Sequence, residues 1–151
     1  NSEQLLRCIF PEILADYFDV IDIQESISRI DFWLDERNFM EEADRKSGTE
    51  AVTAERVVQD FPLRGKSVYL HVRRRKWHDS STGEIFSYSY DDLTAEGSKL
   101  SPEFVSFLKN RIESTAESIT GIGSHYGVDG KQLSTQYNRS CGMTDTLFNT
   151  L

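Results

Sequence analysis

Residues 60–77 place the strongest constraint on the fold, because apolar side chains recur there at every second position. Val68, Leu70 and Val72 alternate with polar or aromatic neighbours, which is the period of a strand with one buried face. The Arg-Gly-Lys sequence at 64–66 predicts the turn that leads into this strand. The stretch therefore predicts a half-buried β-strand entered through a tight turn.

The same stretch ends in a run of four consecutive cations: Arg73, Arg74, Arg75 and Lys76. A continued alternation would place two of these cations on the apolar face, so we expect the strand to end near Val72 or to bulge there. Either outcome turns the cations and Trp77 out of the sheet, where they can meet an anionic partner. A strand edge that is protected by charges against aggregation is the alternative interpretation.

The charge of the 151-residue chain is unevenly distributed. The formal net charge is −8, yet residues 1–63 carry fifteen acidic and six basic side chains, whereas residues 64–151 carry ten acidic and eleven basic ones. An acidic total argues against a general nucleic-acid coat protein. It does not exclude a local basic surface, because charges are screened beyond about 8 Å at physiological salt.

Cysteine and histidine usage gives no sign of a metal site. The two cysteines lie at opposite ends of the chain, and the three histidines lack ligand spacing, so we expect neither a metal nor a cofactor. A disulfide is not expected in a chain of this length. No apolar run reaches about 20 residues and no signal peptide is recognisable, which favours a cytoplasmic protein without membrane contact. Because residue 1 is not methionine, we expect a segment of a longer protein.

The first hundred residues predict a small α+β module. Residues 3–18 have helical periodicity interrupted by Pro11, which predicts two short helices or one kinked helix. Residues 19–36 alternate with a period of two and predict a β-hairpin. Residues 36–55 are polar and predict a surface loop. We interpret the carboxylates of this loop as a solvated surface and not as a metal cluster: Glu41, Glu42 and Asp44.

A second hairpin is predicted beyond Trp77. Residues 85–90 read as its return strand, with aromatic side chains at alternate positions on one face. This hairpin would bring aromatic rings close to the cations of residues 73–76. Basic side chains interleaved with aromatic rings suit contacts to a nucleic-acid backbone and stacking on bases.

The C-terminal third predicts a helical region. Ser101-Pro102-Glu103 is a strong helix start, with serine at the N-cap, proline at the first helical position and an acid in the first turn. Apolar residues between 104 and 112 recur at helical spacing and are interpreted as core.

Residues 119–139 fit a helix-turn-helix. Gly123 is small where the two helices would cross, Gly127 permits the positive φ of the turn, and Val128 would fill the corner. Glycine-containing helical hairpins also occur in proteins that never touch DNA. We expect the outer side of the second helix to carry side chains suited to base edges and phosphates in a major groove: Lys131, Gln132, Thr135, Gln136 and Arg139.

Several motifs together carry a family resemblance. They are Asp-Phe-Pro-Leu-Arg-Gly-Lys at 60–66, Val-Arg-Arg-Arg-Lys-Trp at 72–77, Ser-Pro-Glu-Phe at 101–104 and Tyr-Gly-Val-Asp-Gly-Lys-Gln-Leu at 126–133. With these motifs, roughly residues 4–140 resemble the N-terminal region of bacterial insertion-sequence transposases. The resemblance implies a small N-terminal module and a helix-turn-helix that bind the terminal repeats of the element, ahead of a catalytic domain with an Asp-Asp-Glu metal triad.

The chain departs from that family pattern in one place. Related transposases follow the basic strand with cysteine pairs that bind zinc, whereas this chain has His-Asp-Ser-Ser at 78–81. If the module descends from a zinc-binding one, the metal has been lost and the hairpin must rest on its own core. Three nearby carboxylates are too close in sequence to be the catalytic triad, which needs residues from separate elements: Asp91, Asp92 and Glu96.

The combined interpretation is an α+β module over residues 1–100, followed by a helical DNA-binding part over residues 101–151. We expect it to recognise double-stranded transposon-end DNA without catalysis of its own. The cations at 73–76 would contact phosphates and the second helix would contact bases. The acidic half is a better surface for the catalytic domain or a second subunit.

Three other functions remain open at this point. A protein-interaction or oligomerisation module would use the acidic half and the aromatic hairpin, and would not bind DNA. A small acid–base enzyme lacks a nucleophile motif, a phosphate loop or a metal motif. Binding of RNA or single strands would use the aromatic residues near Trp77.

Overall fold

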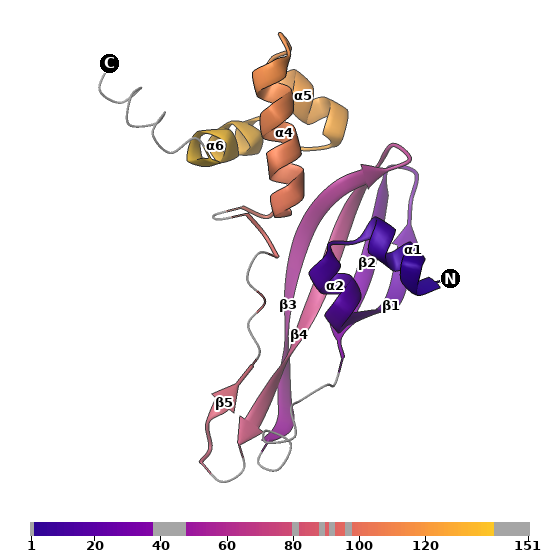
Figure 1. Cartoon of the computed structure of the whole chain (residues 1–151), viewed down its shortest axis with the longest axis vertical. Helices are drawn as coiled ribbons and strands as arrows, with labels where there is room; N and C mark the ends of the chain where they lie inside the picture. The colour runs from indigo at the N-terminus through magenta and orange to yellow at the C-terminus, as the bar shows by residue number, and fades with distance from the viewer. Residues whose placement is uncertain are drawn as a thin grey trace, which may run out of the picture.

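The computed structural model describes residues 2–37, 48–79, 82–87, 90, 93–95 and 98–140. Within these residues the chain has a mixed α+β fold with a five-stranded sheet and five helices (Figure 1). The elements in chain order are α1 (Ser2–Ile9), α2 (Glu12–Tyr17), β1 (Phe18–Glu25), β2 (Arg29–Glu36), β3 (Gly48–Leu63), β4 (Lys66–Asp79), β5 (Ile85–Phe86), α4 (Pro102–Ser114), α5 (Ile119–Tyr126) and α6 (Gly130–Ser140).

The sheet has the strand order β1-β2-β4-β3. Strands β1 and β2 are antiparallel, β2 and β4 are parallel, and β3 and β4 form a long antiparallel ribbon. The short strand β5 pairs with β4 at Trp77 and His78, beyond the point where β2 ends. The central strand is therefore β4, the strand whose alternation dominates the sequence.

The turn between β3 and β4 lies where the sequence predicts it. Arg64 and Gly65 both adopt positive φ angles, +50° and +78°. Two-residue hairpin loops of type I′ require this geometry, because its twist matches that of the flanking strands. After the turn, β4 runs back along β3 and pairs with it over its whole length (Figure 1).

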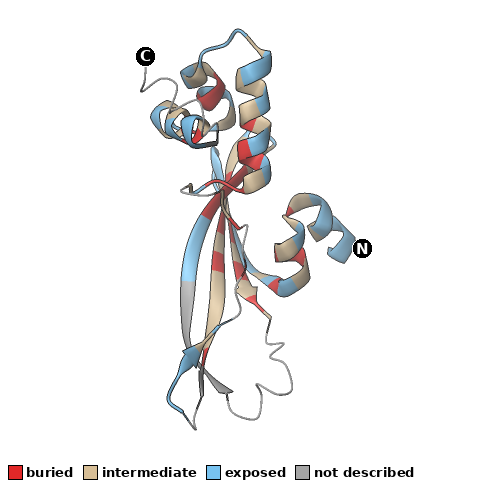
Figure 2. Ribbon diagram, turned by 60° about the vertical axis from the view of Figure 1, so that its left-hand side comes forward, coloured by how far each residue is buried: buried red, intermediate tan, exposed pale blue. Residues whose placement is uncertain are grey.

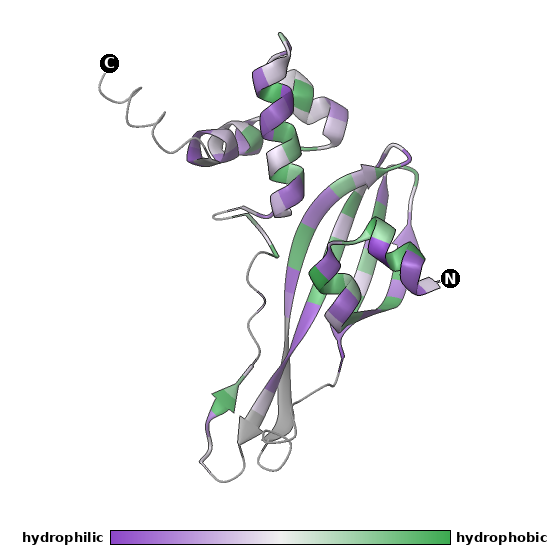
Figure 3. Cartoon of the chain, viewed as in Figure 1, coloured by the Kyte–Doolittle hydropathy of each residue, from purple (hydrophilic) through white to green (hydrophobic). Residues whose placement is uncertain are grey.

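Helices α1 and α2 cover one face of the sheet (Figure 1). Val68, Leu70 and Val72 of β4 are buried on this face, in a cluster that includes Phe10 and Leu14. Figure 3 shows the alternation of apolar and polar positions along the strands. The predicted half-buried strand is confirmed, and so is the interruption of the N-terminal helical region at Pro11, since two short helices lie there.

The polar stretch before the basic strand is not a loop throughout. We predicted a surface loop over residues 36–55, but residues 48–55 belong to β3. The expectation fails there because a two-stranded ribbon needs only backbone partners, and β4 supplies them as far as Asp79. Residues 38–47, with their three carboxylates, lie outside the described part of the chain.

Strand β4 neither ends nor bulges near Val72. Its pairing with β3 stays regular from Arg73 to Lys76, and the extra residue of the nearby irregularity lies in β3, between Glu50 and Val52. Among the described residues, the core cluster includes no β4 residue after Val72. The face that is apolar earlier in the strand therefore tolerates cations further along.

The predicted aromatic face of the second hairpin is also wrong for the residues described. Strand β5 contains only Ile85 and Phe86, and Phe86 stacks on Trp77 with ring centroids 6.0 Å apart. Tyr90 instead packs against Phe18 in the core under the N-terminal helices. Trp77, which we expected outside the sheet, is only 1% exposed.

A second apolar cluster joins the helices to the sheet. Leu100, Phe104 and Leu108 are fully buried with residues of α5 and α6. Phe61 of β3 packs against Phe104 at 5.0 Å between ring centroids. Figure 2 shows the buried positions concentrated where α4 meets the end of the sheet. No helix within the described residues is long and apolar enough to cross a membrane.

Candidate nucleic-acid interface

The ends of α5 and α6 are defined by local side-chain and backbone signals. The Ser118 hydroxyl accepts a hydrogen bond from the Gly121 amide at 3.0 Å and caps α5. Gly127 ends this helix with a left-handed φ of +72°. The Asp129 carboxylate then accepts a hydrogen bond from the Gln132 amide at 3.1 Å, which caps α6. Three residues therefore suffice to connect the two helices.

The helices cross closely because two glycines face the crossing. A Cβ atom on Gly123 would lie 2.5 Å from the Val128 carbonyl oxygen, and one on Gly130 would lie 2.9 Å from the Thr120 hydroxyl. Val128 is buried beside Leu133 in the helical cluster. The predicted small residue at the crossing and the buried valine at the corner are both confirmed.

The helical region is held to the sheet by Gln59 of β3. Its side-chain amide donates to the Gly127 carbonyl oxygen at 2.8 Å. Its backbone amide donates to the Lys99 carbonyl oxygen at 2.7 Å, and its own carbonyl accepts from the Ser101 amide at 2.9 Å. One residue of β3 thus fixes both the turn before α6 and the segment before α4.

Ser101 is the N-cap of α4 and Pro102 its first residue, as predicted, but the Ser101 side chain makes no capping hydrogen bond. Its hydroxyl donates instead to the buried Asp60 carboxylate at 2.7 Å. Burial raises the pKa of Asp60 above its ordinary value, and the hydrogen bond from Ser101 opposes only part of that shift. The site therefore favours the neutral carboxyl more than water does.

We expect Asp60→Asn to change the pH dependence of stability. Because the folded pKa is raised, the Asp60 carboxyl stabilises the fold when protonated, and this contribution is lost as the pH rises above about 3.8. The variant cannot ionise at this position. The free energy of unfolding of both proteins is measured by urea titration between pH 4 and pH 7. The value for the variant minus the value for the natural chain should increase as the pH rises. A difference that stays constant over this range would contradict the expectation.

The residues predicted to contact DNA on α6 are only partly on its outer side. Lys131, Thr135 and Arg139 are exposed and Gln132 is half-buried. Gln136 is 6% exposed, so its predicted outward position is wrong. The reason is that Gln136 lies one helical turn beyond Gln132 and on the side of the buried Leu133.

An open cavity of about 440 Å³ borders α6. It is lined by Ser98, Lys99, Asp129, Lys131, Gln132, Thr135 and Gln136. Four of the five predicted residues of α6 therefore meet at one hollow, and Arg139 is outside this set. Lys99 could not be predicted from the sequence, because an isolated lysine in an irregular segment belongs to no pattern.

Two of the four cations of the basic run are already occupied by protein groups. Arg73 donates to both carboxylate oxygens of Asp35, at 2.6 and 3.1 Å. The Arg75 guanidinium donates to the Glu36 carbonyl oxygen at 2.7 Å. Glu36 is itself buried, and burial raises the pKa of its carboxyl although Tyr90 and the two nearby arginines oppose the shift. Arg74 and Lys76 have no ion-pair partner among the described residues.

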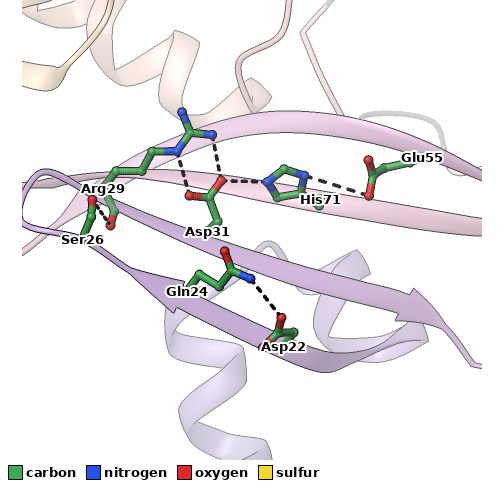
Figure 4. Close-up of polar contacts among 7 residues, drawn as sticks. All are labelled: Asp22, Gln24, Ser26, Arg29, Asp31, Glu55 and His71. Atoms are coloured by element: carbon green, nitrogen blue, oxygen red, sulfur yellow. Dashed lines mark hydrogen bonds and ion pairs between the residues drawn. The ribbon is translucent and has the colours of Figure 1, made fainter.

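The face of the sheet opposite α1 and α2 carries a polar network (Figure 4). Arg29 donates to both carboxylate oxygens of Asp31, and the His71 imidazole contacts the same carboxylate at 2.7 Å. The hydrogen bond from Arg29 is the main reason that the pKa of Asp31 is lowered. His71 also stacks on Trp33, with ring centroids 4.3 Å apart. The network joins β2 to β4, and within the described chain no serine, threonine or cysteine hydrogen-bonds to His71.

The described ranges contain no group of three or more histidine, cysteine, aspartate or glutamate side chains placed to hold a metal ion. Cys8 is exposed and unpaired. Asp91, Asp92, Glu96 and Cys141 lie outside the described residues. The strongest candidate for a functional surface is therefore the cavity beside α6. No protein-family model, no curated protein and no solved structure gives a significant match to this chain.

Proposed function

We propose that this chain binds double-stranded DNA through α6 and serves as the end-recognition region of a transposase. The observation that carries the proposal is the meeting of Lys131, Gln132 and Thr135 on one accessible side of α6, at an open cavity. All three side chains can form hydrogen bonds. Their chemistry suits recognition of base edges and phosphates.

The geometry of α5 and α6 supports a helix-turn-helix. A left-handed Gly127 and a buried Val128 form the three-residue connection with Asp129. In such units the second helix enters the major groove and its N-terminal residues contact base edges. Lys131 and Gln132 lie in the first turn of α6, which is the part of the helix that would reach the bases.

The side chains at these positions match known base contacts. Glutamine can bond both N6 and N7 of adenine, lysine can reach O6 and N7 of guanine, and threonine can bond to either type of base edge. Helix α6 has 11 residues, so it is about 16 Å long. A helix with its side chains is about 10–12 Å in diameter, which fits a major groove about 12 Å wide.

The choice of transposon ends as the DNA rests on the family resemblance of the motifs at 60–77 and 126–133. In that role the chain would bind the element and leave strand cleavage to a separate catalytic domain. Of the basic run, we retain Arg74 and Lys76 as phosphate contacts, because Arg73 and Arg75 already bind Asp35 and Glu36.

A second candidate function is protein interaction through the edge strand β1. Ile23 on this strand is 56% exposed and Ile27, in the following turn, is 95% exposed. Among the described strands, β1 pairs with β2 alone, and an exposed strand edge can accept another strand. This surface belongs to the acidic half of the chain and is compatible with DNA binding by α6.

Fluorescence anisotropy tests the proposed function directly. The chain is titrated into a labelled duplex that carries the end repeat of the parent element, and into a scrambled duplex of equal length and composition. We expect tighter binding to the repeat. Lys131→Ala with Gln132→Ala should reduce the preference for the repeat by about 5- to 150-fold, because one good bidentate base contact discriminates by about 1–3 kcal/mol. The control is Arg7→Ala, which removes one cation from α1.

Two results would count against the proposal. Equal affinity for both duplexes would exclude end recognition and leave only contact with the DNA backbone. An absence of binding to either duplex at low salt would exclude DNA recognition by this chain, and the edge strand β1 would become the leading surface.

A further inference from the structure

A second hollow adjoins the cavity beside α6. It has a volume of about 380 Å³ and is lined by Arg56, Val57, Thr94, Ser98 and Lys99. Ser98 and Lys99 also line the first cavity, so the two hollows share a wall. We call these two neighbouring hollows, whose linings include Arg56, Lys99 and Lys131, the trough; one borders α6 and the other borders the edge strand β3.

The backbone of the trough is held firmly although its cationic side chains are exposed. The Lys99 carbonyl accepts the backbone hydrogen bond from Gln59, and Leu100 pairs with Gln59 as a parallel bridge. Arg56 precedes Gln59 by three residues on β3, and its guanidinium lies 3.4 Å from the Thr94 hydroxyl. Arg56 and Lys99 line the same hollow.

Five other cations of the described surface are neutralised by carboxylates, and those of the trough are not. Arg7, Arg29, Arg37, Lys66 and Arg73 each lie within ion-pair distance of a carboxylate. In the described ranges no such partner lies beside Arg56, Lys99 or Lys131. The chain has a net charge of −8, yet these two hollows are lined by three cations without a carboxylate pair, which favours an anionic occupant.

One acid also lines the trough and is already engaged. The Asp129 carboxylate accepts a hydrogen bond from the Gln132 amide at the first turn of α6. The positive end of the helix dipole offsets part of its charge there. Three cations against this one carboxylate leave the described lining with a positive balance.

From this arrangement we infer that Arg56 and Lys99 bind phosphates of the same duplex whose bases α6 contacts. The inference rests on the proposed function, because α6 forms one wall of the trough. Lys99 lines the hollow beside α6 and Arg56 lines the adjoining one, and a cation contacts phosphates whatever the base sequence. The trough is thus a sequence-independent contact that sets affinity and register, and α6 supplies the preference for sequence.

The salt dependence of binding tests this inference. Dissociation constants are measured by anisotropy at several salt concentrations for the natural chain, Arg56→Ala, Lys99→Ala and the double variant. Each lost phosphate contact should reduce the slope of log affinity against log salt by about 0.9, so the double variant should lose about 1.8. Affinity for the repeat and the scrambled duplex should fall by the same factor. Lys99→Arg should keep the slope of the natural chain.

The matched control is again Arg7→Ala, which changes the net charge equally but lies on α1. Its slope should equal that of the natural chain. If Arg56→Ala and Lys99→Ala bind with unchanged slopes, the inference is wrong while the proposed function stands. If a variant loses the preference for the repeat, the trough contacts bases and the sequence-independent assignment is wrong. If the natural chain binds neither duplex, the proposed function fails and the inference fails with it.

Discussion

Trp77→Ala should lower the free energy of unfolding by about 3–5 kcal/mol, the usual range for removing a buried tryptophan. The indole is only 1% exposed and stacks on Phe86, with 24° between the ring planes. Strand β5 reaches β4 at this residue. The substitution would therefore leave a cavity and remove the main side-chain contact between β4 and β5.

The other tryptophan of the chain is the natural control. Trp33 is half-buried and stacks on His71 on the polar face of the sheet. Trp33→Ala should lower the free energy of unfolding by the contribution of its partly buried apolar area plus about 0.5–1.5 kcal/mol, the range for a single aromatic pair. Urea titration of both variants compares the two positions. Equal losses of stability in the two variants would contradict the role of Trp77 as a buried anchor. Because its indole is buried, Trp77 cannot serve as a platform on which a base stacks.

Gly127→Ala should lower the free energy of unfolding by about 2–5 kcal/mol. The residue has a φ of +72°, which costs an L-amino acid about 1–2 kcal/mol. A Cβ atom would also lie 2.2 Å from the Ser67 hydroxyl of β4, and relief of such crowding typically costs about 1–3 kcal/mol. The loss reflects both the turn before α6 and its contact with the sheet.

Gly65 provides a control that separates the two contributions. It has a similar φ of +78°, but a Cβ atom there would meet nothing within 4 Å. Gly65→Ala should therefore show only the conformational cost, about 1–2 kcal/mol. Combining Gly127→Ala with Ser67→Ala should recover about 1 kcal/mol in a double-mutant cycle measured by urea titration. Strict additivity of Gly127→Ala and Ser67→Ala would contradict a steric contact between these positions.

The candidate interface was partly predictable. The glycines and the buried valine of the α5–α6 connection can be recognised from the sequence, because a left-handed turn and a close helix crossing each restrict the residue type. Lys131, Gln132 and Thr135 could therefore be assigned to one helix. The burial of Gln136 and the placement of Lys99 and Arg56 beside that helix could not, because they depend on how α6 and the segment before α4 meet β3.

The sequence by itself determined which side of each local backbone is apolar. The alternation of Val68, Leu70 and Val72 predicted a strand, and the positions of Pro11 and Pro102 predicted a helix interruption and a helix start. These signals are local, since they arise from the period of one element and from the backbone limits of single residues.

Only the tertiary structure decided which strands and charges became neighbours. It made β2 and β4 parallel partners, continued β3 to Gly48, and paired Arg73 with Asp35. Strand pairing uses backbone groups that every residue possesses, and charge pairing joins residues far apart in the chain, so neither leaves a periodic trace in the sequence. The basic run was visible as a cluster of charge, but the fold determined which of its members are committed to the protein.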